Sequence, residues 1–133
     1  NHIVSNNLDM GTLACNISEE YKYLDENIVK VKAEEELKKN HVIKADNFYR
    51  KLNIQNKKNI YHHIGIYLYK VSILEKITSL KQTNNEKKQR LEQLRALENN
   101  IDINLVLAKS SPIGIDTKED YIKIKNLLEK KNL

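Results

Sequence analysis

The sequence predicts an α/β protein in which a mixed sheet is flanked by helices. Strand-like stretches at 10–17, 61–70 and 101–107 alternate with helix-like stretches at 72–99 and 117–130, the order of elements expected of an α/β fold. The chain has 133 residues with only 3 Gly and 1 Pro, so we expect one ordered domain with a real core.

The first half is expected to hold short elements. Residues 10–17 are predicted as a strand, 18–26 as a short acidic connection that tolerates helix, and 28–31 as a brief strand. Residues 30–39 are rich in Glu and Lys and are interpreted as one or two helical turns.

The chain is organised around the strand predicted over 61–70. Alternation along this strand places four residues on one face, His63, Gly65, Tyr67 and Tyr69, and three on a purely aliphatic face expected in the core, Ile64, Ile66 and Leu68. A glycine inside a strand indicates either a bulge or a close approach to the backbone. Two interpretations follow: a bulge glycine beside a half-buried histidine, or a small polar ligand over Gly65, held between His63 and Tyr67.

The second half has clearer boundaries. The spacings Ser72 to Glu75 and Thr83 to Glu86 predict two capping boxes and therefore two helix starts. The second helix is expected to run to about Asn99, and the alternation over 101–107 predicts a half-buried strand. One face of that second helix is apolar, at Leu91, Leu94 and Leu97. The final helix is expected to bury Tyr121, Ile124, Leu127 and Leu128.

Composition limits the partners. The net charge is +5, but the lysines are spread among Glu and Asn without an aromatic-interleaved basic patch, so we expect no nucleic-acid partner. No run approaches a membrane span and no signal peptide is visible, so no membrane partner is expected. The single Cys15 has no internal disulfide partner, which suits a reducing cytosol.

Three motifs in order resemble a known family. His63 begins the run His-Ile-Gly-Ile-Tyr-Leu-Tyr-Lys, residues 91–97 read Leu-Glu-Gln-Leu-Arg-Ala-Leu, and residues 114–120 read Gly-Ile-Asp-Thr-Lys-Glu-Asp. Together they resemble bacterial CMP-Kdo synthetases, the 3-deoxy-manno-octulosonate (Kdo) cytidylyltransferases. The resemblance implies a partial nucleotide-diphospho-sugar-transferase-like (Rossmann-like) fold with a mostly parallel sheet. It also implies transfer of CMP from CTP to Kdo with release of pyrophosphate, for lipopolysaccharide biosynthesis in the bacterial cytoplasm.

The resemblance also implies site residues. Asp116 would ligate Mg²⁺ and serve catalysis, and Arg50 would pair with the sugar carboxylate. Contacts to Kdo would come from His63, Tyr67, Glu92 and Gln93. Two structural interpretations stay open: Glu92 can pair with Arg95 along its helix, and residues 116–119 themselves form a capping box.

The motifs match only the C-terminal half of the family's usual length, and the chain begins with Asn. Residues 1–133 are therefore expected to be the sugar-binding and dimerisation part of a cytidylyltransferase domain, without its N-terminal nucleotide-binding half. Alone, this part is expected to be inactive, to leave an unpaired sheet edge and an uncovered apolar face, and to form a homodimer as the family does.

Three other functions remain open on the sequence alone. The chain can belong to a cytidylyltransferase for another acidic sugar, such as a sialic-acid-like compound, because the segment from Arg50 to His63 is shorter than the family norm. It can instead be a non-catalytic interaction module that keeps the fold, or a basic RNA-binding domain, the weakest of the three.

Overall fold

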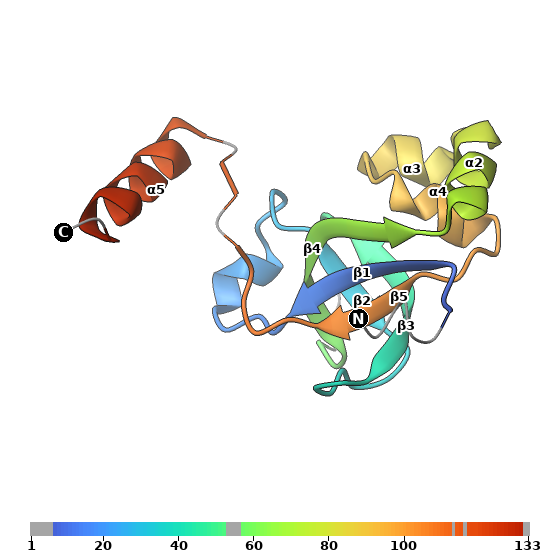
Figure 1. Cartoon of the computed structure of the whole chain (residues 1–133), viewed down its shortest axis with the longest axis horizontal. Helices are drawn as coiled ribbons and strands as arrows, with labels where there is room; N and C mark the ends of the chain where they lie inside the picture. Colours follow the sequence, from blue (N-terminus) through green and yellow to red (C-terminus); the bar gives the residue numbers. More distant parts are fainter. Residues whose placement is uncertain (1–6, 53–56, 113, 116, 132–133) are drawn as a thin grey trace.

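The computed structural model describes residues 7–52, 57–112, 114–115 and 117–131. In chain order, its elements are β1 (Met10–Cys15), the 3₁₀ helix η1 (Glu20–Tyr23), β2 (Lys30–Ala33), β3 (Val42–Tyr49), β4 (Ile60–Tyr69), α2 (Val71–Ser79), α3 (Asn84–Gln89), α4 (Gln93–Glu98), β5 (Asn104–Leu107) and α5 (Lys118–Lys131). Helices α2, α3 and α4 gather at the end of β4, whereas α5 stands apart beyond the opposite end of the sheet (Figure 1). The predicted class, a mixed sheet flanked by helices, is confirmed.

The five strands form one sheet that closes on itself in the order β1–β4–β2–β3–β5. Among the described strands, only β1 and β5 pair in parallel, and the other four pairs are antiparallel. The expectation of a mostly parallel sheet is therefore wrong for this part of the fold. The expected unpaired edge is also wrong among the described strands, because each of them has a neighbour on both sides.

The core fills the inside of the closed sheet. Side chains alternate along a strand, so every second residue of β1, β2 and β5 points inward. The most deeply buried apolar side chains of the core include Met10 and Ala14 of β1, Val31 of β2, Phe48 of β3, Leu105 of β5 and Ile103 just before β5. The strands predicted near 10–17 and 101–107 are confirmed with shorter bounds, whereas the helical turns predicted over 30–39 are wrong, because β2 occupies their start.

A bulge interrupts β4 and changes which side chains reach the core. Thr12 of β1 pairs with Tyr67, but the next residue, Leu13, pairs with Ile64, so two residues of β4 are left over between them. The bulge confirms the structural interpretation of Gly65. It also makes the aliphatic-face prediction wrong beyond Ile64: Ile66 is 58% exposed and Leu68 is 44% exposed.

The helices begin and end differently from the sequence prediction at two places. The capping box of Thr83 and Glu86 is present at α3, but α2 begins at Val71 without a side-chain cap, which makes the box predicted at Ser72 wrong. The helix predicted to run unbroken to Asn99 is interrupted, because Arg90 adopts a left-handed conformation (φ 54°, ψ 48°) between α3 and α4.

Helix α5 exposes the side that it was expected to bury. Tyr121 is 54%, Leu127 48% and Leu128 58% exposed. Its first turn is capped by Thr117 and Asp120, whose side chain and backbone groups bond reciprocally, one residue later than the predicted capping box. None of the helices in the described ranges has the length and apolar character needed to cross a membrane.

Candidate functional site

A cavity of about 230 Å³ lies where β4 meets the helices α2 and α4. Its polar lining comes from Tyr67, Tyr69, Thr78, Glu92 and Gln93, and Met10, Leu74, Ile77 and Ala96 supply an apolar wall. Three of the six predicted site residues, Tyr67, Glu92 and Gln93, are thus brought to one cavity from two sequence motifs that lie more than 20 residues apart.

His63 stands directly behind Tyr67 in a row of aromatic rings. The centroids of the His63 and Tyr67 rings lie 5.4 Å apart, and Tyr67 in turn stacks on Tyr69 at 5.7 Å. On its other side, His63 meets the ring of Phe48 edge-on at 5.0 Å. Rings at this separation are in contact, so the structure leaves no room for a ligand between His63 and Tyr67, although the space above Gly65 itself is open.

Burial keeps the aromatic groups of the site neutral. Desolvation lowers the pKa of His63 from 6.5 to about 4, because the charged imidazolium is disfavoured away from water. Desolvation likewise raises the pKa of the phenols of Tyr67 and Tyr69. At neutral pH both phenols therefore keep their protons and can donate hydrogen bonds into the cavity.

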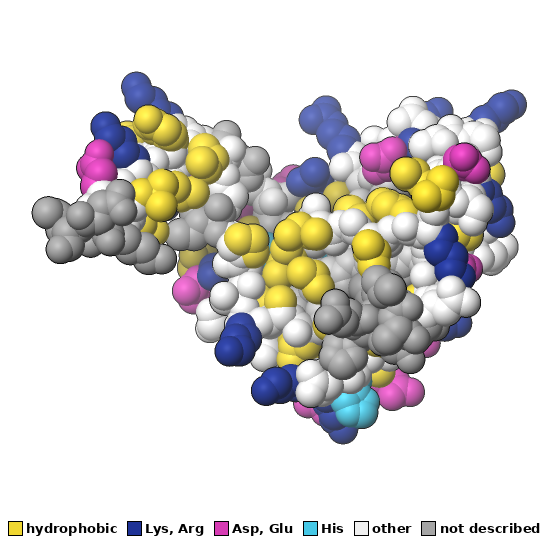
Figure 2. Space-filling view, viewed as in Figure 1, with side chains coloured by type: hydrophobic (Ala, Val, Ile, Leu, Met, Phe, Trp, Pro, Cys, Tyr) yellow, Lys and Arg dark blue, Asp and Glu magenta, His cyan; other side chains and the backbone are white. Residues whose placement is uncertain are grey.

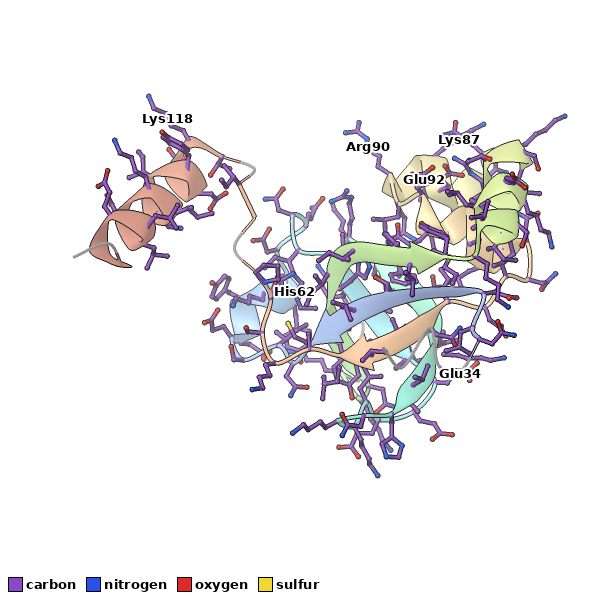
Figure 3. The ribbon with its side chains drawn as sticks, viewed as in Figure 1. Glu34, His62, Lys87, Arg90, Glu92 and Lys118 are labelled. Carbon is purple, nitrogen blue, oxygen red and sulfur yellow. The ribbon has the colours of Figure 1, made fainter. Side chains whose placement is uncertain are left out.

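Glu92 and Gln93 reach the cavity from the start of α4. Gln93 is buried, whereas the side chain of Glu92 is largely exposed and lies 3.6 Å from Nη2 of Arg95. The predicted pairing of Glu92 with Arg95 is therefore present. Figure 3 shows Glu92 at the end of the molecule that holds α2, α3 and α4, close to Lys87 and Arg90.

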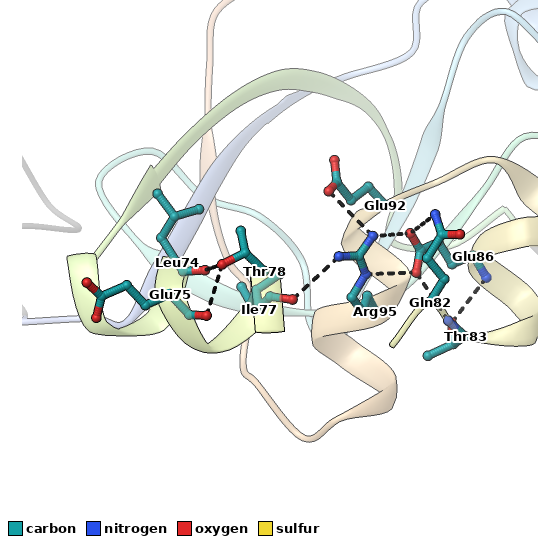
Figure 4. Close-up of polar contacts among 9 residues, drawn as sticks. All are labelled: Leu74, Glu75, Ile77, Thr78, Gln82, Thr83, Glu86, Glu92 and Arg95. Carbon is teal, nitrogen blue, oxygen red and sulfur yellow. Dashed lines mark hydrogen bonds and ion pairs between the residues drawn. The ribbon is translucent and has the colours of Figure 1, made fainter. Parts of the chain in front are cut away.

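Arg95 binds Glu86 more closely than it binds Glu92, with Nη2 2.5 Å from a carboxylate oxygen of Glu86 and 3.6 Å from one of Glu92. Nε of Arg95 donates to Glu86 at 2.9 Å, and Nη2 donates to the second carboxylate oxygen, a bidentate pair that ties α4 to α3 (Figure 4). Arg95 also donates to the carbonyl of Ile77 at the end of α2. The pair lowers the pKa of the Glu86 carboxyl. This network fixes the three helices around the cavity.

A second, more open cavity of about 480 Å³ adjoins the first. Glu92 lines both cavities, and the cationic side chains of Lys87, Arg90 and Arg95 line the second one only. Positive charge therefore lies outside the first cavity, because none of the described residues that line it is cationic.

Arg50 does not line either of these cavities. Its guanidinium donates instead to backbone carbonyls, those of Gln89, Arg90 and Glu26, at 3.0, 3.3 and 3.2 Å. The sugar contact predicted for Arg50 stays a prediction.

Asp116, the predicted Mg²⁺ ligand, lies outside the described residues. Within the ranges that the structure describes, no three His, Cys, Asp or Glu side chains gather where a metal ion could be held. The Mg²⁺ site predicted at Asp116 therefore stays a prediction.

Two residues around the site were not singled out from the sequence. Thr12 is buried beside His63, with its hydroxyl 3.0 Å from Nε2. The sequence feature that could have indicated Thr12 is its position between Met10 and Ala14, two buried residues on the same face of β1. Lys30 is fully buried on β2, and no sequence signal marks it, because lysine is rarely buried.

Comparisons with known proteins agree with this architecture. The family model described as cytidylyltransferase matches residues 1–103. The 3-deoxy-manno-octulosonate cytidylyltransferase of Acidobacterium capsulatum is 55% identical over 40 residues, which are 30% of this chain and 16% of that protein. The enzyme of the same name from Rhodospirillum rubrum is 46% identical over 41 residues, 31% of this chain and 16% of that protein.

A solved structure has the same fold. The structure of CMP:2-keto-3-deoxy-manno-octonic acid synthetase complexed with CTP superposes with a TM-score of 0.80 at 24% sequence identity. The match covers 97% of this chain and 53% of that chain, so this chain spans about half the length of the protein that it resembles.

Proposed function

The chain belongs to the cytidylyltransferase family, and from this membership we propose that it is the sugar-binding part of an enzyme that activates Kdo with CTP. The observation that carries the proposal is the meeting of Tyr67, Glu92 and Gln93 at one cavity. The names of the sequence relatives support Kdo as the sugar, and the CTP complex of the structural relative supports the nucleotide.

The cavity is small and partly polar, which suits a small hydroxylated ligand. Its volume of about 230 Å³ is below the roughly 300–1,000 Å³ typical of drug-sized ligands. Glu92 accepts hydrogen bonds from sugar hydroxyls, Gln93 donates and accepts, and the protonated phenol of Tyr67 donates. Met10 and Ala96 offer an apolar wall to the carbon face of the ring.

The sugar carboxylate has to face out of this cavity. The lining residues that the structure describes include no cation, and Glu92 would repel a second carboxylate. His63 adds no charge at neutral pH and supports the ring of Tyr67 instead of meeting the carboxylate. This orientation leaves the acidic end of the sugar free for groups outside the cavity.

In the proposed reaction, the anomeric hydroxyl of Kdo attacks the α-phosphorus of CTP and pyrophosphate leaves. Mg²⁺ would supply charge neutralisation at the phosphates, with Asp116 as its proposed ligand. The part played by the described residues is to bind and orient the sugar, which lowers the entropic cost of bringing the two substrates together. We further propose a homodimer, which is supported by the exposed aliphatic side chains of β4 and α2.

Calorimetric or NMR titration with Kdo tests this function. Glu92→Gln removes the charge of an acceptor at nearly constant size, so we expect it to weaken Kdo binding about tenfold or more. Glu98→Gln is the matched control, because it makes the same change at an exposed position of α4 outside both cavities. Equal affinity in both variants would contradict the assignment of Glu92.

A panel of ligands separates the remaining alternatives. Preference for a sialic acid over Kdo would replace the sugar in the proposal, and a folded chain indifferent to both would favour a non-catalytic module. Formation of CMP-Kdo by this chain alone would show that it is more than the sugar-binding part.

A further inference from the structure

Arg50, directly after β3, ties three backbone segments together. Its Nε donates to the carbonyl of Gln89 at 3.0 Å, Nη2 to that of Arg90 at 3.3 Å, and Nη1 to that of Glu26 at 3.2 Å. The backbone amide of Arg50 also lies 3.4 Å from the side-chain oxygen of Gln89. Each of the three guanidinium nitrogens, Nε, Nη1 and Nη2, thus donates a hydrogen bond to a backbone carbonyl.

The carbonyls of Gln89 and Arg90, which Arg50 contacts at the end of α3, need a hydrogen-bond donor. Gln89 is the last residue of α3, and Arg90 follows it in a left-handed conformation. The last carbonyls of a helix have no partner within the helix, and they carry the negative end of its dipole. A guanidinium at this point satisfies two of them and has the favourable charge, so Arg50 caps the end of α3 from another element.

Lys30 in turn holds the backbone of Arg50. Its side chain is fully buried on β2, and Nζ donates to the carbonyl of Arg50 and, at 2.8 Å, to that of Asp25. Burial lowers the pKa of this ammonium, and the nearby Asp25 and Glu26 charges partly oppose that effect. Taking an ammonium out of water is costly unless it is hydrogen-bonded. Moving either carbonyl away would break a hydrogen bond of the buried ammonium, so Lys30 holds both carbonyls in place.

The turn capped by Arg50 leads directly into the proposed sugar cavity. Leu91, the residue after Arg90, is buried, and Glu92 and Gln93 follow it. The Glu86–Arg95 pair joins α3 to α4 on one side of this turn, and the Arg50 contacts anchor it to β3 on the other.

We propose that Arg50, held by Lys30, is a positioning residue that sets the 89–93 turn, and with it Glu92 and Gln93, against the cavity. The effect on sugar binding rests on the proposed function, but the effect on the turn does not. In this role Arg50 affects sugar binding without contacting the sugar.

The test compares Arg50→Gln with Lys51→Gln in the full 133-residue chain. Lys51 carries the same charge at the next position, and within the described part of the chain its ion pair is an exposed one with Glu26, whose side chain is 56% exposed. Amide hydrogen exchange and NMR shifts report on residues 89–95, and titration with Kdo reports on the cavity. We expect Arg50→Gln to speed exchange in this turn about tenfold and to weaken Kdo binding of the folded chain by a similar factor, with both unchanged in Lys51→Gln.

Each outcome separates the possible roles. Unchanged exchange and shifts at 89–95 in Arg50→Gln would overturn the proposal, and so would weaker Kdo binding with an unchanged turn, because Arg50 would then contact the sugar itself. A residue that only stabilised the fold would lower the Tm but leave the Kd of the folded chain unchanged. If the unaltered chain does not bind Kdo, the proposed function fails, and the exchange data still decide whether Arg50 positions the turn.

Discussion

Thr12 and His63 form a buried polar contact at the bulge of β4. The Thr12 hydroxyl lies 3.0 Å from Nε2 of His63, and 3.0 and 2.8 Å from the carbonyls of Ile64 and Ile66. A hydroxyl has one proton, which it gives to a carbonyl, so it accepts a hydrogen bond from His63. The neutral imidazole with its proton on Nε2 satisfies this arrangement, and it holds His63 behind Tyr67.

The lowered pKa of His63 predicts a loss of stability in mild acid. The unfolded chain takes up a proton at this histidine near pH 6.5, whereas the folded chain does so only near pH 4. Protons therefore favour the unfolded state in this window, and the stabilisation present above pH 6.5 is lost as the pH falls through 4. The difference amounts to roughly 3 kcal/mol. Urea unfolding at several pH values measures it.

His63→Gln keeps a donor for Thr12 but does not titrate, so we expect it to flatten the slope of unfolding free energy against pH between 6.5 and 4. A smaller slope should remain, because burial also lowers the pKa of His62. His41→Gln makes the same replacement at an exposed position and is the control. A slope that is equal in all three proteins would show that His63 protonates freely in the folded chain.

The sequence could predict the residues that line the cavity but not the positioning roles of Arg50 and Lys30. Tyr67, Glu92 and Gln93 follow from motifs with a family resemblance, and the structure brings them together. The cap that Arg50 provides depends on a contact between residues that are 39 positions apart, and the burial of Lys30 depends on the packing of the whole sheet. Local patterns carry no information on such long-range contacts.

Among the elements, α3 and α4 show where local rules fail. The capping box at Thr83 predicts the start of α3 correctly, because both of its partners lie within one turn. No glycine or asparagine at position 90 indicates the break between α3 and α4. The break follows instead from the burial of Leu91 and from the Glu86–Arg95 pair. The bulge at Gly65 similarly overrides simple alternation in β4.

The left-handed backbone of Arg90 predicts that glycine stabilises the break. A side chain at positive φ is strained, and glycine is not. We therefore expect Arg90→Gly to raise the free energy of unfolding by about 0.5–1 kcal/mol. Lys87→Gly is the control, because the same replacement inside α3 should lower it by about 1 kcal/mol. Chemical denaturation measures both, and destabilisation by both variants would show that Arg90 contributes more through its side chain than its backbone costs.

On the scale of the whole molecule, closure of the sheet removes its edges but leaves apolar faces open. Hydrophobic side chains gather on the visible surface of α5 and over the sheet and helices (Figure 2). Beside the cavity, the exposed aliphatic side chains are Ile66, Leu68, Val71 and Leu74 of β4 and α2. An apolar face is thus uncovered among the described residues, as expected, and the bulge in β4 is what turns Ile66 and Leu68 outward.

This β4–α2 face predicts self-association of the chain, the basis of the proposed homodimer. In a symmetric dimer the same patch is used twice, so each substitution acts on both copies. Ile66→Lys with Leu68→Lys places charges in the contact, and we expect the dissociation constant, measured by sedimentation velocity over a concentration series, to rise on the order of a hundredfold. The matched control, Leu127→Lys with Leu128→Lys, makes the same changes on the exposed face of α5. A monomer at every concentration would contradict the homodimer, and a larger effect of the α5 variant would move the contact from β4 to α5.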